Sequence, residues 1–182
     1  MSYLRTRTWL CGLAISLVAT GCTVASPPGT PIPPSAQVLP ADARALAYGR
    51  TTAELLQNPE VGDKIRALFG ADWWGATRGG GQLAPGAAAY FEQGGPVGML
   101  RIGSTDYIAV SGCVPGACDT GRVLLLIEDG DSRLLARLDE GGFVHYYSYG
   151  GEGIRRDTAP VIVDSGLRAL YRAGNPYPRS RS

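Results

Sequence analysis

The chain has 182 residues, of which 45% are hydrophobic and 18% are charged; this is enough apolar material for one packed domain and excludes a wholly disordered protein. Its 17 basic and 16 acidic residues nearly balance, so it lacks the excess of positive charge typical of proteins that bind nucleic acid, and no nucleic-acid partner is expected. With one lysine, Lys64, and one histidine, His145, it offers little for lysine-dependent or histidine-paired catalysis.

Residues 1–21 have the features of an export signal. Arg5 and Arg7 precede an apolar run over residues 9–19, and this run is shorter than the roughly 20 residues that a permanent membrane-spanning helix needs. A positive start, a short apolar middle and small residues at the end are typical of a secretory signal peptide.

The export signal is followed by Cys22, at the end of the sequence Ala-Thr-Gly-Cys. This sequence resembles a bacterial lipobox, in which the cysteine is acylated and becomes the mature N-terminus. The alternative is an ordinary signal peptide that happens to contain a cysteine. The lipobox interpretation predicts a lipid anchor on Cys22. An aspartate after the cysteine often retains lipoproteins at the inner membrane, and this chain has Thr23 there, so the outer membrane facing the periplasm is the expected location.

Residues 22–40 are predicted to form a tether. Six prolines lie between residues 23 and 40, and such a composition favours an extended, semi-rigid spacer over a packed structure. A domain anchored to a membrane needs a spacer of this kind. The folded domain is then expected over residues 41–174, with residues 175–182 as a flexible tail.

Short helices are predicted on both sides of a central region. Thr51 and Glu54 form a capping-box pattern, and apolar residues at helical spacing follow Asn58-Pro59 up to Gly70. Residues 71–96 are rich in glycine and alanine and are expected to be irregular. A C-terminal helix is predicted from about residue 158 to Gly174.

The central region has the period-two pattern of β-strands. Short links between the segments indicate antiparallel neighbours, and the unbroken apolar run Val123–Ile127 is typical of a central strand with both faces covered. The prediction is an α+β domain with a five-stranded antiparallel meander flanked by the N-terminal and C-terminal helices. The expected strands are residues 97–102, 107–112, 122–128, 133–138 and 143–149.

Two of the four cysteines are expected to remain available for a disulfide. Cys11 leaves with the export signal and Cys22 carries the lipid, so Cys113 and Cys118 remain, and in an oxidising compartment they are predicted to form a disulfide. A zinc site is the rival interpretation, and it lacks ligands because the only histidine is 27 residues away. We therefore expect no metal site and no cofactor.

The disulfide would close a loop between two predicted strands. The candidate binding residues are the six that form it: Cys113, Val114, Pro115, Gly116, Ala117 and Cys118. A small closed loop loses little ordering entropy on binding and suits insertion into the cleft of another protein. A structural staple between two strands explains the same pattern equally well, so residue chemistry alone leaves both interpretations open.

Other candidate sites have simpler explanations. No nucleophile motif of a hydrolase is present, so an enzyme is not expected. Trp73-Trp74 could anchor a partner or pack in the core, and the carboxylates near residues 128–131 are typical of a solvated turn. Because side chains alternate between the two faces of a strand, four of them share one face of the last predicted strand: Phe143, His145, Tyr147 and Tyr149. This face could bind a ligand, or it could be an ordinary packed face.

The loop and its flanking strands resemble the Ivy family, the inhibitors of vertebrate lysozyme found in bacterial periplasms. In that family a strand of the type Tyr-Leu-Val leads into the loop Cys-Lys-Pro-His-Asp-Cys, and an apolar strand follows. This chain has Tyr-Ile-Ala-Val at residues 107–110, then Cys-Val-Pro-Gly-Ala-Cys at residues 113–118, then the apolar run Val123–Ile127. The resemblance covers roughly residues 50–173 and is specific only around the loop.

The resemblance implies a sheet with surrounding helices, a glycan hydrolase related to lysozyme as the partner, and the option of a homodimer. It implies that the loop enters the cleft of that enzyme. The chain departs from the family at the side chains that would make the contacts, because Gly116 replaces the histidine, Val114 the lysine and Ala117 the aspartate. Backbone N–H groups, for example at Gly116 and Ala117, would then be the remaining donors. The expected protein is an inhibitor, with a non-inhibitory envelope lipoprotein as the alternative.

Overall fold

The computed structural model describes residues 32–76, 80–128, 130, 132–151, 158–174 and 177. The predicted export signal, the lipidation site Cys22, and Asp129 and Asp131 of the acidic turn lie outside these residues. Within the described part of the chain, no helix is both long enough and apolar enough to cross a bilayer.

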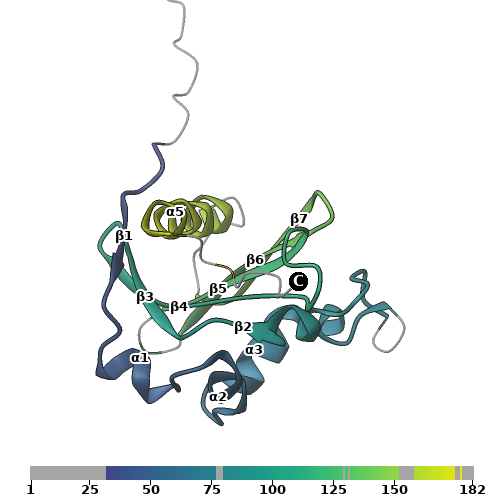
Figure 1. The fold of residues 1–182 in the computed structure, drawn as a ribbon. Helices are drawn as coiled ribbons and strands as arrows, with labels where there is room; N and C mark the ends of the chain where they lie inside the picture. Colours follow the sequence, from purple (N-terminus) through teal and green to yellow (C-terminus); the bar gives the residue numbers. More distant parts are fainter. Residues whose placement is uncertain are drawn as a thin grey trace, which may run out of the picture. The chain divides into compact units, whose positions relative to one another are not determined.

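A seven-stranded antiparallel sheet forms the centre of the domain (Figure 1). Five of its strands follow one another as the predicted meander, so the fold class is confirmed, while the predicted number of strands is too low. Along the sheet the order is β1-β3-β4-β5-β6-β7, and β2 pairs with β4 outside this path. The strands are β1 (Ala36–Leu39), β2 (Gln93–Gly94), β3 (Gly98–Ile102), β4 (Thr105–Cys113), β5 (Gly121–Glu128), β6 (Arg133–Glu140) and β7 (Phe143–Gly150).

The first strand lies inside the segment assigned to the tether. Residues 36–39 pair with β3, with Ala36 opposite Ile102 and Leu39 opposite Met99. These four residues contain no proline, so their N–H groups are available to a neighbouring strand. The sheet therefore begins before the predicted boundary at residue 41.

The strand β5 is the central strand, as its apolar run predicts. Val123, Leu125 and Ile127 are fully buried in a core on one face of the sheet, and Leu124 and Leu126 are fully buried in a second core on the other face. Alternate side chains of a strand point to opposite faces, so this single apolar run supplies both layers.

The N-terminal helices cover one face of the sheet (Figure 1). The N-cap of the predicted capping box is confirmed at α2, where the Thr51 side chain accepts a hydrogen bond from the N–H of Glu54 at 3.2 Å, while the Glu54 carboxylate accepts one from the N–H of Arg50 at 2.8 Å. The segment 71–96 holds short 3₁₀ helices, so it is less irregular than predicted. The elements are α1 (Ala43–Ala47), α2 (Thr52–Gln57), α3 (Gly62–Phe69) and the 3₁₀ helices η1 (Gly70–Trp73) and η2 (Ala87–Phe91).

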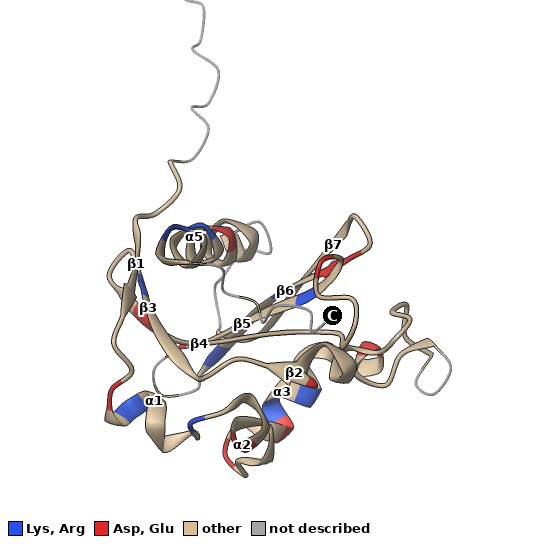
Figure 2. Cartoon of the chain, in the orientation of Figure 1, with Lys and Arg blue, Asp and Glu red and all other residues tan. Residues whose placement is uncertain are grey.

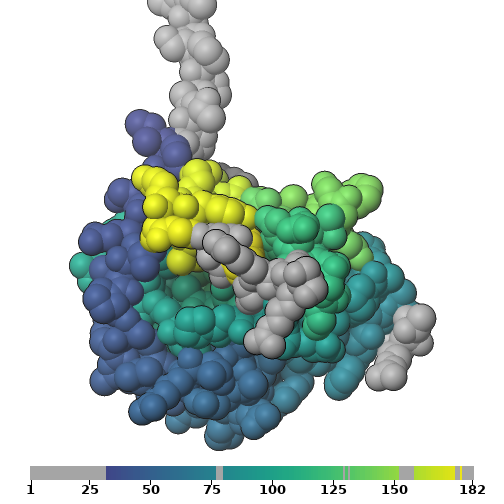
Figure 3. All heavy atoms as spheres, viewed as in Figure 1, coloured from purple at the N-terminus to yellow at the C-terminus, as the bar shows by residue number. Residues whose placement is uncertain are grey.

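The helix α5 (Thr158–Ala173) covers the opposite face. In the space-filling view it lies in yellow on one side of the sheet strands, and the blue helical segments lie on the other side (Figure 3). Gly166 allows this close packing, since a Cβ atom there would lie 3.1 Å from the side chains of Leu100 and Ile102. Tyr177, in the predicted flexible tail, is 4% exposed and belongs to the same core, so at this residue the tail is packed.

Candidate functional site

The candidate loop is a tight turn closed by the predicted disulfide. The bond between Cys113 and Cys118 is present. Inside it, the N–H of Ala117 donates to the carbonyl oxygen of Val114 at 2.9 Å. Pro115 occupies the first central position and Gly116, with φ +78°, the second. This is the pattern of a type II turn, in which proline presets the first φ angle and glycine supplies the positive one.

Backbone hydrogen bonds join this turn to the sheet. The N–H of Val114 donates to the carbonyl of Gly121 at 3.0 Å, and the N–H of Gly121 donates to the carbonyl of Ala117 at 2.7 Å. Cys113 is the last residue of β4 and lies opposite Arg122 of β5. The loop therefore continues the ladder between two central strands, and its direction is fixed by the sheet.

Arg122 fixes the second half of the loop. Its Nε donates to the carbonyl oxygen of Cys118 at 2.6 Å, and one of its terminal nitrogens donates to the hydroxyl of Tyr171 on α5 at 2.9 Å. The guanidinium also stacks on the ring of Tyr177, 5.2 Å from its centre. This arginine links the loop to the C-terminal helix and the packed tail residue.

The tip of the loop is exposed and uncharged. Pro115 and Gly116 are exposed, Val114 and Ala117 are half-buried, and both cysteines are buried. The expected N–H donor at Ala117 is already used within the turn, which corrects that part of the prediction. Among the described residues, the N–H of Gly116 has no backbone acceptor, so the surface that the tip presents to a partner is a proline ring and one glycine.

Replacing both Cys113 and Cys118 by serine is expected to lower the free energy of unfolding by about 2 kcal/mol, the chain-entropy value for so small a closed loop. Because four backbone hydrogen bonds hold the loop region without the disulfide, the fold should persist. Urea unfolding followed by circular dichroism measures the loss. Complete unfolding of the double variant in buffer would contradict a peripheral role for the bridge.

The two adjacent tryptophans have different environments. Trp73 is 7% exposed and packs against Phe69 and Phe91, with ring centres 5.9 and 6.0 Å away. Trp74 is 57% exposed. Core packing is therefore confirmed for Trp73, and Trp74 alone remains accessible to a partner.

The aromatic face of β7 also contains both packed and exposed side chains. Tyr147 packs against Phe69 with ring centres 4.8 Å apart, and its hydroxyl donates to Asp72 at 2.9 Å. Phe143, at the start of the same strand, is 72% exposed. His145 lies between them, with its Nε2 3.3 Å from a carboxylate oxygen of Glu140. The predicted ligand platform is thus half core and half surface.

The strand β7 is an open edge of the sheet. Its ladder partner is β6, and no other strand pairs with it among the residues the structure describes. It carries no lysine, arginine, aspartate or glutamate, as Figure 2 shows in tan. Side chains on both faces are exposed: Phe143, Val144, Tyr146 and Tyr149. An uncharged edge strand of this length is suited to pairing with another polypeptide.

A groove runs beside the loop. Its volume is about 180 Å³. Three segments that are far apart in the sequence form its walls. They contribute Ala84, Pro85 and Tyr90 from the first segment, Val114, Ala117, Thr120 and Gly121 from the second, and Glu140 and Gly141 from the third. The turn after β6 is bonded to the loop region, since the N–H of Gly141 donates to the carbonyl of Thr120 at 3.0 Å. No local sequence pattern indicated this groove.

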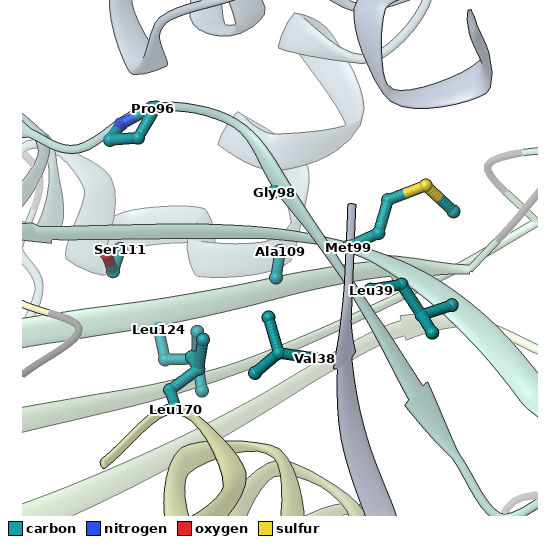
Figure 4. Close-up of a pocket in the computed structure, with 9 residues that line it drawn as sticks. All are labelled: Val38, Leu39, Pro96, Gly98, Met99, Ala109, Ser111, Leu124 and Leu170. Carbon is teal, nitrogen blue, oxygen red and sulfur yellow. The ribbon is translucent and has the colours of Figure 1, made fainter. Parts of the chain in front are cut away.

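A larger apolar hollow lies next to β1 (Figure 4). Its volume is about 270 Å³, and small residues on the face of the sheet create it: Gly98, Ala109 and Ser111. Leu124 from the sheet and Leu170 from α5 lie close together at one side, with Val38 of β1 nearby. Its lining suits an apolar group, and it carries no carboxylate or basic side chain.

Of the three carboxylates in the acidic turn, the structure describes Glu128. Glu128 accepts a hydrogen bond from Arg133 at 2.8 Å, so its charge is already compensated. Within the described residues, no group of three histidine, cysteine, aspartate or glutamate side chains could hold a metal ion.

Comparison of the chain with family models, with curated proteins and with solved structures found no match. The resemblance to the Ivy family stays a prediction from the sequence of the loop and its two flanking strands.

Proposed function

We propose that this protein is a lipid-anchored inhibitor of a lysozyme-like glycan hydrolase, placed at the outer membrane and facing the periplasm, and that it is not itself an enzyme. The target is a host lysozyme or a toxin delivered by a competing bacterium. The observation that supports this proposal is the exposed turn Val114–Ala117, closed by a disulfide and hydrogen-bonded to two central strands.

The turn acts as a preformed wedge. Its conformation is fixed by a disulfide, a proline and backbone hydrogen bonds, so entering a cleft costs little conformational entropy. A glycosidase cleft lined by two carboxylates is narrow and acidic. A tip made of Pro115 and Gly116 brings no negative charge into it, and the glycine allows close approach of the backbone.

A cell-wall lysis assay tests this function. The exported protein carrying Cys22→Ser is added at increasing concentration to a panel of vertebrate lysozymes and bacterial muramidases acting on peptidoglycan. We expect saturable inhibition of at least one enzyme at micromolar concentration or below. Unchanged lysis across the panel would contradict the inhibitor proposal.

Lipidation is tested by the same substitution in cells. The wild-type protein should sediment with the outer membrane, whereas Cys22→Ser should move to the soluble periplasmic fraction because it loses the acylated residue. Thr23→Ser is the matched control and should stay with the membrane. Retention of the Cys22→Ser variant on membranes would refute the anchor.

The open edge of β7 supports the alternative function, a non-inhibitory envelope lipoprotein that binds another protein. An extended segment of a partner, or of a second copy in a homodimer, can add to this edge through main-chain hydrogen bonds. Capture of envelope-assembly proteins by the wild type, lost in Val144→Lys and kept in a variant of the loop tip, would favour this alternative over inhibition.

A further inference from the structure

The groove beside the loop contains a carboxylate, Glu140, whose one basic neighbour among the described residues is a histidine. The Glu140 side chain is 27% exposed and accepts a hydrogen bond from the N–H of Ala84 at 3.1 Å. Its other carboxylate oxygen lies 3.3 Å from Nε2 of His145. An ionised carboxylate accepts about four hydrogen bonds, so it retains capacity for further donors.

Two other half-buried acids of the sheet form ion pairs with arginine. Glu128 lies 2.8 Å from Arg133, and Asp139, the residue before Glu140, lies 2.8 Å from Arg137. Arginine thus compensates both of these half-buried carboxylates. Within the part of the chain that the structure describes, no arginine or lysine forms an ion pair with Glu140.

A tyrosine lines the same groove. Tyr90 is 1% exposed as a residue, and it forms part of the groove wall. Burial, and then the charge of Glu140, raise the pKa of Tyr90 to about 12, so the phenol is protonated at neutral pH. A protonated phenol in the wall of a groove can form a hydrogen bond with an incoming group.

The walls of the groove are mostly aliphatic. Ala84, Pro85, Val114 and Ala117 contribute to them, while Glu140 supplies the negative charge. The volume of about 180 Å³ is below the roughly 300–1,000 Å³ of pockets for drug-sized ligands, so it suits one side chain. Lysine and arginine have this combination of an apolar stem and a cationic head.

We propose that the groove between the disulfide loop and residues 84–90 binds one lysine or arginine side chain of the partner protein, with Glu140 as its counter-ion and Tyr90 as a second polar contact. The assignment of this cation to the enzyme that the loop enters rests on the proposed function. The uncharged tip fills the cleft, and the groove beside it supplies the charged contact that the tip lacks.

Small probes test the groove without any target enzyme. The exported protein carrying Cys22→Ser is titrated with n-butylguanidinium, n-butylammonium and the neutral isostere n-butylurea, and amide signals are followed by NMR at pH 8. We expect saturable shifts at Thr120, Gly121 and Gly141, with a dissociation constant on the order of 1 mM for a cation. The urea should bind at least about 10-fold more weakly. The two cations distinguish an arginine from a lysine.

Three variants locate the contact. Glu140→Gln keeps an acceptor for Ala84 and removes the charge, so it should weaken cation binding at least about 10-fold, while Tyr90→Phe should weaken it about 3-fold. Asp119→Asn is the matched control, because Asp119 lies next to the loop with its side chain 94% exposed and outside the groove. It should leave the dissociation constant of the cation unchanged.

Equal binding of the urea and the cations, or binding that survives Glu140→Gln, would overturn the groove assignment. Neither result depends on the lysis assay. Conversely, a protein that binds the cations through Glu140 and inhibits no hydrolase would support the groove as a cation site and contradict the proposed function.

Discussion

Replacing Gly116 by tryptophan should abolish inhibition of the target hydrolase, with a loss of at least about 100-fold in the inhibition constant. A Cβ atom at Gly116 would meet nothing within 4 Å inside the protein, so the new side chain extends outward from the tip. There it blocks the entry of the turn into a cleft. The lysis assay, run as a concentration series, measures the change.

The matched control is Gly130→Trp. Gly130 has φ +81°, close to the +78° of Gly116, and it also has no atom within 4 Å of a Cβ position. Both variants place a large L-residue in the left-handed region and should lose about 1–2 kcal/mol of stability. If Gly116→Trp still inhibits as well as Gly130→Trp, the loop is a structural staple and the site lies elsewhere.

Replacing Gly112 by alanine should lower the free energy of unfolding by about 3 kcal/mol, as expected for overpacking against a rigid backbone. Gly112 precedes Cys113 in β4. A Cβ atom there would lie 2.5 Å from the carbonyl oxygen of Tyr90 and 3.3 Å from the Cα atom of Phe91. The 3₁₀ helix η2 would have to move away from the sheet, and thermal unfolding in a calorimeter measures the cost.

Gly98→Ala is the comparison for this effect. Gly98 lies in the neighbouring strand β3, and its Cβ position is 3.9 Å from the nearest atom, the carbonyl oxygen of Ala109, which is ordinary contact. We expect a change within about 0.5 kcal/mol. Similar losses in both variants would indicate that a methyl group anywhere in this part of the sheet is harmful, and would contradict the specific clash at Gly112.

The meander was predictable because its pattern is local. The alternation of β6, the apolar run of β5 and the short glycine turns each act over a few residues, and the structure has the five expected strands in the expected order. The strand β1 was not predictable in this way. Its residues 36–39 are a strand only because the edge of β3, about 60 positions later, provides hydrogen-bond partners.

The candidate site shows the same division. The disulfide and the positive φ of Gly116 follow from residue types inside six consecutive positions. The groove does not, because Tyr90, Ala117 and Glu140 are distant in sequence and meet only when η2 packs below the ends of β4 and β6. The stacking of Tyr177 on Arg122 was missed for a similar reason, since it depends on where α5 ends.

The bonds that shape the turn are main-chain bonds, and this has an evolutionary consequence. Val114 and Ala117 are held through their N–H and carbonyl groups, and the side chains at residues 114, 116 and 117 take no part in the hydrogen bonds that hold the turn. Residue types in the loop can therefore vary within the limits set by the positive φ of Gly116 and the packing of Val114, while the scaffold stays constant, much as antibody loops vary on a fixed framework. For the proposed inhibitor, a change of target would then involve substitutions in the loop, with the sheet beneath it unchanged.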